Sequence, residues 1–177
     1  MKKPFDEYTQ QYDLWFDTTG RFTGFMNIKF GVDPSANSLK LAKGRVKNLV
    51  CGYAEDLPFK NGSFDFALVV VSICFFDDIL RAFSEIGRIL KVGGKLILGF
   101  VPRNTCIGEF YVYKGLGGHR FYKYAKFFTE GEIERIANSG GFKKLRTLYL
   151  FSGKRGAYLR NSWGFRAKFA VMEFLKL

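Results

Sequence analysis

The chain has 177 residues and a formal net charge of +12, because 28 Lys and Arg outnumber 16 Asp and Glu. Hydrophobic residues make up 47% and charged residues 25%, a balance typical of a folded globular protein and unlike a disordered chain. Lys, Arg or Gly interrupts every apolar run before it could span a bilayer, so we expect one domain over residues 1–177 and no membrane partner.

The positive charge is unevenly distributed. Residues 1–100 carry a net charge of +2, and residues 101–177 carry +10. An excess of this kind fits an anionic partner, such as a nucleic acid, a phosphorylated metabolite or a membrane surface. A solvated basic face is the alternative, and we favour it because no nucleic-acid-binding motif accompanies the charge.

The cysteine and histidine content narrows the chemistry. Cys51, Cys74 and Cys106 are an odd and widely spaced set, which fits reduced thiols in a cytoplasmic protein. His119 is the sole histidine, which argues against a histidine-based metal site and against a Ser–His–acid triad. No spacing ties Cys74 to His119, so a buried structural thiol is a better interpretation of Cys74 than a nucleophile.

The N-terminal third predicts a helix, then a strand, then a second helix. Aromatic residues recur every three to four positions over residues 5–16, which indicates a helix, with a short strand at Leu14–Phe16 as the alternative. Phe25–Val32 is typical of a strand. A short helix is expected next, with Pro34 in its first turn and Gly44 as its stop.

The middle of the chain alternates apolar strands with one helix. We expect strands at Val46–Cys51, Phe64–Ser72 and Lys95–Val101. Between the last two, Asp77 or Asp78 caps a helix that Gly93–Gly94 ends. The apolar face of this helix comprises Ile79, Leu80, Phe83, Ile86 and Leu90.

The C-terminal part begins with an aromatic segment, residues 103–126, that has no clean period. Thr129 and Glu132 then form a capping box, which predicts a helix that ends at Gly140–Gly141. Phe142–Phe151 and Phe165–Leu175 follow as two consecutive strands, joined by a basic loop. Consecutive strands can pair antiparallel, whereas parallel strands need crossover connections. The fold class is therefore α/β, a doubly wound, mostly parallel sheet with an antiparallel C-terminal hairpin.

Asp33 is the first candidate binding residue. It lies between a strand and a helix, at the edge of an open α/β sheet where ligands bind, and an acid there accepts hydrogen bonds from ribose hydroxyls. Capping of the following helix is the alternative. Ala54–Glu55–Asp56 follows the next strand, where a carboxylate and backbone groups suit an adenine edge, although an acidic surface turn is also compatible with it.

Several motifs together resemble class I S-adenosylmethionine-dependent methyltransferases, most closely the small methyltransferase-11 type. The similarity covers roughly residues 20–150. The motifs that carry it are Gly52-x-Ala54-Glu55-x-Leu57-Pro58-Phe59, Ser63-Phe64-Asp65-Phe66, Asp77-Asp78, and Arg88-Ile89-Leu90-Lys91-Val92-Gly93-Gly94-Lys95-Leu96.

The resemblance implies a Rossmann-like, seven-stranded sheet and S-adenosylmethionine as the methyl donor. It places the ribose-binding acid at Asp33, the adenine side at Tyr53–Glu55, and the methyl region at Val71–Ile73. The implied cofactor-binding positions are Gly20, Asp33, Pro34, Tyr53, Ala54, Glu55, Val71, Ser72 and Ile73. Because the donor sulfonium is already activated, the protein's part is orientation in a dry cleft.

The chain departs from the family at its glycine-rich loop. Thr19-Gly20-Arg21-Phe22 retains a single glycine, and Phe16-Asp17-Thr18 stands where earlier glycines belong. This pattern indicates a deletion, so that the family's first strand is missing or replaced by Leu14–Phe16. We therefore expect weak or absent donor binding, and a gap in the sheet that a rearranged N-terminus or a partner chain fills.

Residues 103–126 are the natural substrate lid, although an aromatic cap that simply packs on the sheet explains them equally well. The lid would supply the aromatic residues Tyr111, Tyr113, Phe121, Tyr122 and Tyr124, and the cations Arg103, Lys114, Arg120 and Lys123. His119 is a weak candidate for a general base.

The leading function is methyl transfer to an unidentified acceptor, most simply a small molecule. The first alternative is an inactive methyltransferase-like protein whose basic C-terminal face binds an anionic partner such as RNA. The second is an incomplete product of a complete gene, with no independent function. The sequence leaves open whether the protein is a monomer or a homodimer.

Overall fold

The computed structural model describes residues 28–153 and 156–177. The expectations for residues 5–16, for Leu14–Phe16 and for Gly20 lie outside this part of the chain. The chain divides into two compact units at Pro58 and Phe59, and each unit is described by itself. That residues 1–177 form one domain stays a prediction.

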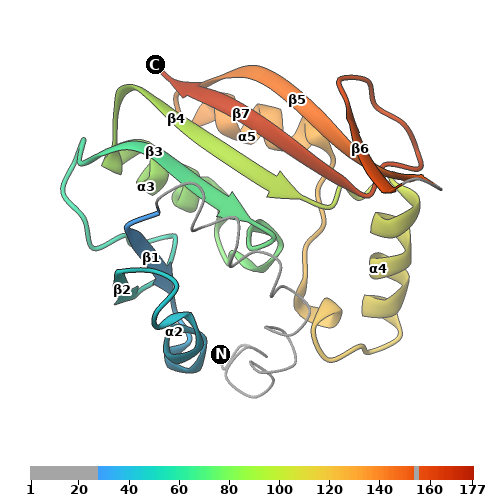
Figure 1. The fold of residues 1–177 in the computed structure, drawn as a ribbon, viewed down its shortest axis with the longest axis horizontal. Coiled ribbons are helices and arrows are strands. Elements are labelled where there is room, and N and C mark those ends of the chain that lie inside the picture. The colour runs from blue at the N-terminus through green and yellow to red at the C-terminus, as the bar shows by residue number, and fades with distance from the viewer. Residues whose placement is uncertain (1–27, 154–155) are drawn as a thin grey trace. The chain divides into compact units, whose positions relative to one another are not determined.

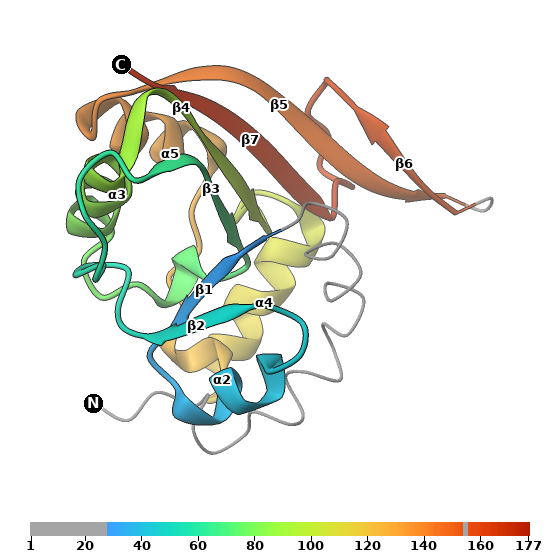
Figure 2. The same ribbon diagram turned by 60° about the vertical axis from the view of Figure 1, so that its left-hand side comes forward.

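The first unit contains a pair of parallel strands. β1 (Phe30–Asp33) pairs with β2 (Asn48–Cys51), and α2 (Ala36–Ala42) connects them (Figure 2). Ser35 caps α2, because its hydroxyl oxygen accepts a hydrogen bond from the Ser38 N–H at 3.2 Å. Pro34 therefore precedes the cap and does not lie in the first helical turn, which corrects the sequence-based expectation.

The second unit is a five-stranded mixed sheet with helices. Its strands run in the order β3-β4-β7-β5-β6, with β3 and β4 parallel and the other pairs antiparallel. Figures 1 and 2 show α3 and α5 against one face of this sheet, and α4 beyond the end to which β3 and β4 run. In chain order the elements are β3 (Phe64–Val70), η1 (Ile73–Phe75), α3 (Ile79–Ile89), β4 (Leu90–Phe100), α4 (Cys106–Leu116), η2 (Tyr122–Tyr124), α5 (Glu130–Ser139), β5 (Phe142–Gly153), β6 (Gly156–Arg160) and β7 (Phe169–Lys176).

The core of the second unit lies between this sheet and the two helices. Leu96 and Leu98 alternate along β4 and are fully buried, as the two-residue period of a strand requires. Phe83 of α3 packs edge-on against Phe142 of β5, with ring centroids 6.4 Å apart. The predicted capping box of α5 is present and confirmed, since Thr129 and Glu132 satisfy each other's backbone N–H groups.

The predicted end of α3 was wrong. The helix ends at Ile89, and Leu90 already has extended backbone and begins β4. Gly93, at φ +79°, lies within β4, where the pairing with β3 shifts register. The glycine pair therefore marks a bulge, and not the helix end. Leu80 is also exposed, although it was expected on the buried face.

Two further segments differ from expectation. Residues 103–126 contain α4, whose apolar side chains lie on all of its sides, so no helical period is visible in the sequence. The loop expected between the last two strands contains β6, which forms a hairpin with β5. β7 lies between β4 and β5, and its antiparallel pairing with β5 agrees with the predicted antiparallel C-terminal strands.

A substitution at Gly108 tests how closely α4 packs on the segment before it. A Cβ atom at Gly108 would collide with the carbonyl oxygen of Pro102 and lie 2.9 Å from backbone atoms of Arg103. We expect Gly108→Ala to lower the free energy of unfolding by about 2 kcal/mol, measured by chemical denaturation. Gly131→Ala in α5 is the matched control, because nothing lies within 4 Å of its Cβ position, and it should stabilise by about 0.5 kcal/mol. Equal effects would contradict this packing.

Candidate functional site

Asp33 ends β1 and lies at the carboxyl edge of the first unit. It is opposite Cys51 in the strand pairing, and its carbonyl oxygen accepts a hydrogen bond from the Gly52 N–H at 3.4 Å. Its carboxylate Oδ1 accepts a hydrogen bond from the Ser35 N–H at 2.7 Å. Since Ser35 supplies the cap of α2, Asp33 is not the capping residue, and its carboxylate is held in place next to the strand ends.

The residues expected on the adenine side follow β2 at the same edge. A turn over Tyr53–Asp56 closes with a hydrogen bond from the Asp56 N–H to the Tyr53 carbonyl oxygen at 3.2 Å. A Cβ at Gly52 would lie 3.4 Å from Val32 and from Pro58, so the loop packs closely onto β1 at this point. The structure thus brings Asp33, Pro34 and the Tyr53–Glu55 segment to one edge of the first unit.

The remaining donor-site candidates follow β3 in the second unit. Val71 has φ 56°, and it is the one non-glycine residue with positive φ among residues 28–153 and 156–177. For a β-branched residue this conformation costs about 1–3 kcal/mol, and such strain concentrates at functional sites. The Val71 N–H still donates to the Gly99 carbonyl oxygen at 2.8 Å, so the chain leaves the sheet only after that bond. Ser72 then precedes η1, in which Ile73 is buried.

Cys74 is a structural thiol. Burial raises the pKa of its thiol to about 12, and its Sγ lies 3.7 Å from the Val71 carbonyl oxygen, to which the thiol donates. A thiol with this pKa stays protonated at neutral pH and is a poor nucleophile. The Cys74 carbonyl oxygen accepts a hydrogen bond from the Lys126 N–H at 2.7 Å, which ties the end of the aromatic segment to η1.

The aromatic segment is a stacked layer. Tyr122 lies between Tyr111 and His119, with ring centroids 4.4 Å and 4.6 Å away and interplanar angles of 21° and 20°. Phe127 completes the layer at 6.1 Å from both tyrosines. Burial raises the pKa of Tyr122, so its hydroxyl stays protonated. The hydrogen bond from the Lys126 N–H to the Cys74 carbonyl oxygen ties the aromatic segment to the residues after β3. No residue spacing in the sequence predicts the stacking.

His119 is held in its neutral form. Burial lowers the pKa of its imidazole below 6.5, and the nearby charges of Lys114 and Arg120 lower it further. Its Nδ1 accepts a hydrogen bond from the Phe121 N–H at 3.4 Å, which leaves Nε2 to carry the ring proton.

The described residues offer no metal site, since no three His, Cys, Asp or Glu side chains among them converge. Much of the local positive charge is also paired. Arg103, Lys144 and Arg146 form ion pairs with Glu132, Glu134 and Glu173, listed in the same order. Each of these pairs joins one acid to one cation, so the net charge of +10 over residues 101–177 remains after the pairing.

Comparisons with known proteins identify the family. Residues 18–98 match the model of a family described as a methyltransferase domain. An uncharacterized protein of Methanocaldococcus jannaschii is 32% identical over 169 residues, which cover 80% of this chain and 82% of that protein. A crystal structure from Thermotoga maritima, titled a SAM-dependent methyltransferase and possible histamine N-methyltransferase, is 30% identical, with a TM-score of 0.89 and 98% of each chain covered. The chain belongs to the class I S-adenosylmethionine-dependent methyltransferases.

Family membership confirms the expected Rossmann-like α/β fold and S-adenosylmethionine as the cofactor. An uncharacterized protein of Mycobacterium tuberculosis is 34% identical over 125 residues, 71% of this chain but 44% of that protein. The deletion at the glycine-rich loop stays a prediction.

Thiol reactivity tests the assignment of Cys74. Cys51 and Cys106 are exposed, whereas Cys74 is buried. In the native protein at about pH 8, we expect a thiol reagent to label the two exposed cysteines within minutes and Cys74 only after denaturant is added, as read by mass spectrometry. Rapid labelling of all three native thiols would contradict a buried, protonated Cys74.

The pKa of His119 predicts a pH-dependent stability. Because the folded-state pKa lies below the value of 6.5, the unfolded chain binds the proton more readily, and the free energy of unfolding falls as the pH drops through 6.5 towards the folded pKa. His119→Gln should lose this slope between about pH 5 and pH 7, measured by denaturant unfolding, with wild type as the reference. Since the chain has one histidine, parallel curves for the two proteins would refute the shift.

Proposed function

We propose that this protein is an active enzyme that transfers the methyl group of S-adenosylmethionine to a small-molecule acceptor. The observation that carries the proposal is the placement of Asp33, a carboxylate fixed by the Ser35 N–H at the carboxyl edge of two parallel strands. This is the edge at which α/β sheets bind ligands, and a carboxylate there suits a pair of ribose hydroxyls.

The residues of the first unit fit the adenosine part of the donor. Asp33 supplies acceptor atoms for the ribose, and the close packing at Gly52 presents the Tyr53–Glu55 backbone beside it. In the second unit, Val71–Ile73 are proposed to contact the methionine and methyl region, since the strained turn at Val71 directly follows the carboxyl end of β3. When bound, S-adenosylmethionine supplies a methyl group already activated by its sulfonium.

The protein's own residues then orient the acceptor and keep water away. The stacked layer of Tyr111, Tyr122 and His119 is proposed as the lid. His119 is the candidate base, since its imidazole is neutral and its unprotonated Nδ1 can take a proton from an acceptor once it releases the Phe121 N–H. Cys74 takes no part, since its raised pKa keeps the thiol protonated.

Similar proteins support a small acceptor. Besides the possible histamine N-methyltransferase of Thermotoga maritima, a demethylmenaquinone methyltransferase of the same organism is 38% identical over 78 residues, covering 42% of this chain and 34% of that protein. No observation on the described residues favours the inactive, RNA-binding alternative. The single glycine at Gly20 is expected to make donor binding weaker than is usual in the family.

Donor binding by Asp33→Asn tests the proposal. Losing hydrogen bonds to a charged carboxylate costs about 1.5–3 kcal/mol, so we expect the dissociation constant for S-adenosylmethionine to rise by about ten- to a hundredfold in calorimetric titration. Asp65→Asn, an exposed acid of β3 that is outside the candidate site, is the matched control and should bind as wild type does.

Two results would count against the donor site. The first is unchanged affinity in Asp33→Asn. The second is the absence of any thermal stabilisation of wild type by saturating donor, which at a hundredfold excess over the dissociation constant should add about 2.7 kcal/mol. RNA binding without donor binding would favour the inactive alternative.

A further inference from the structure

The helix α4 carries apolar side chains on its outer side as well as on its inner side. Glu109 and Lys114 are its only charged residues between Cys106 and Leu116. On the inner side, a Cβ at Gly108 or at Gly115 would collide with neighbouring backbone, so the helix lies tightly against the unit. A helix that is apolar all round is normally buried on every side.

The outer side of α4 is nevertheless exposed. The exposed fractions of its apolar side chains are 47% for Phe110, 75% for Tyr113 and 85% for Leu116. Phe165 is also exposed and lies beside the start of the helix, because the Cys106 N–H donates to its carbonyl oxygen at 2.9 Å. These four residues are called the outer α4 surface, and contiguous exposed apolar groups of this kind mark interaction sites.

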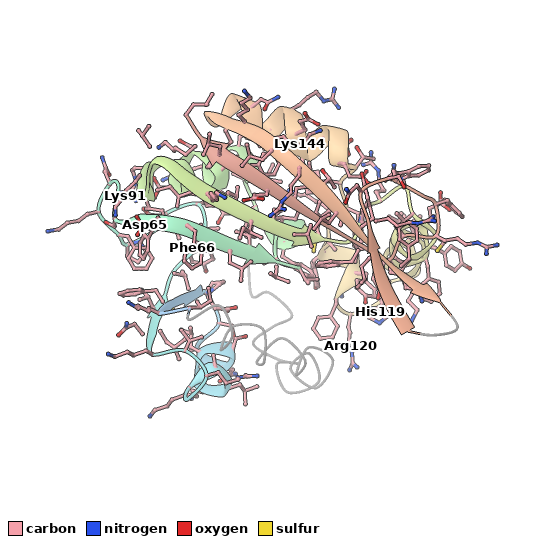
Figure 3. The ribbon with its side chains drawn as sticks, turned by 45° about the horizontal axis from the view of Figure 1, so that its top comes forward. Asp65, Phe66, Lys91, His119, Arg120 and Lys144 are labelled. Carbon is pink, nitrogen blue, oxygen red and sulfur yellow. The ribbon has the colours of Figure 1, made fainter. Side chains whose placement is uncertain are left out.

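A shallow hollow adjoins this surface at the C-terminal end of α4. Its volume is about 560 Å³, and it is lined by Tyr113, Lys114, Leu116, Gly117, Gly118 and His119. Figure 3 shows His119 and Arg120 far from the Asp65–Lys91 ion pair, at the other end of the second unit. The hollow shares Tyr113 and Leu116 with the outer α4 surface.

Cations border the outer α4 surface. The Lys114 ammonium lies 4.9 Å from the centroid of the Phe110 ring, and Arg166 directly follows Phe165 and is exposed. Beyond the helix, Arg120 and Lys123 lie over the rings of Phe121 and Tyr124. Glu109 is the one acid on α4, so positive charge predominates around these apolar groups.

We propose that the outer α4 surface attaches the protein reversibly to an anionic lipid bilayer. Phe110, Tyr113 and Leu116 would enter the boundary between head groups and acyl chains, and Lys114 with its neighbouring cations would meet anionic head groups. Leu116, the most exposed of the three, is aliphatic and offers no ring for stacking on a base, which favours lipid over RNA.

The sequence predicts no membrane partner because no segment is long enough to span a bilayer, and no helix of the described residues could cross one. Surface attachment has a different requirement. It needs a small exposed apolar area bordered by cations, and a net charge of +12 attracts the protein to an anionic bilayer before contact.

Co-sedimentation with vesicles tests the inference. Wild type should sediment with phosphatidylcholine vesicles that contain about one quarter phosphatidylglycerol, and much less with phosphatidylcholine alone. The double variant Tyr113→Ser, Leu116→Ser should lower the partition coefficient at least about tenfold. Lys114→Gln should lower it about fivefold on the anionic vesicles and leave binding to neutral vesicles unchanged.

Leu80→Ser and Val92→Ser are the matched controls, since these side chains are 57% and 81% exposed on α3 and β4. Both should sediment as wild type does. Absence of wild-type binding, or equal losses in the controls, would overturn the proposal. Two other results, obtained without vesicle binding, would also overturn it. In the first, wild type binds a uridine homopolymer and the double variant does not. In the second, light scattering shows that wild type is a dimer and the double variant a monomer.

Discussion

The hydrogen bond from the Val71 N–H to the Gly99 carbonyl oxygen is the contact on which the second unit depends most. It extends the pairing of β3 with β4 by one residue, and Val71 then turns the chain out of the sheet at φ 56°. That turn buries Ile73 and Cys74 in η1 and presents the Cys74 carbonyl oxygen to the Lys126 N–H. The aromatic layer is consequently tied to the end of β3, where a methyl donor is expected.

Sequence patterns predict those parts of the fold in which neighbouring residues interact. The alternation of Leu96 and Leu98 predicts β4, and the Thr129–Glu132 spacing predicts the start of α5, because both depend on local periodicity or on local hydrogen bonds. The glycines at 93–94 misled the prediction of α3, since a glycine at positive φ suits a β-bulge as well as a helix end. The strain at Val71 gives no sequence signal, because tertiary packing imposes a conformation that valine itself disfavours.

In the candidate site, too, features set by local sequence are predictable and features set by tertiary packing are not. Asp33 is predictable from its position after a strand, and the structure places it at the expected edge with Tyr53–Glu55. The stacking of Tyr111 and His119 on Tyr122 joins residues of α4, η2 and the loop between them, and α4 has no detectable period. Ion pairs between distant segments are also not predictable from sequence spacing. Glu173 is buried between Lys95 and Arg146, and the hydrogen bond from Lys95 lowers its pKa most.

The central claim is that the carboxyl edge of β1 and β2 binds the ribose of the methyl donor through Asp33. A crystal structure of the protein with S-adenosylhomocysteine, the demethylated product of the donor, tests it most directly. The account predicts both ribose hydroxyls within about 3 Å of the Asp33 carboxylate oxygens. A product molecule bound elsewhere, or crystals that bind none at saturating concentration, would contradict it.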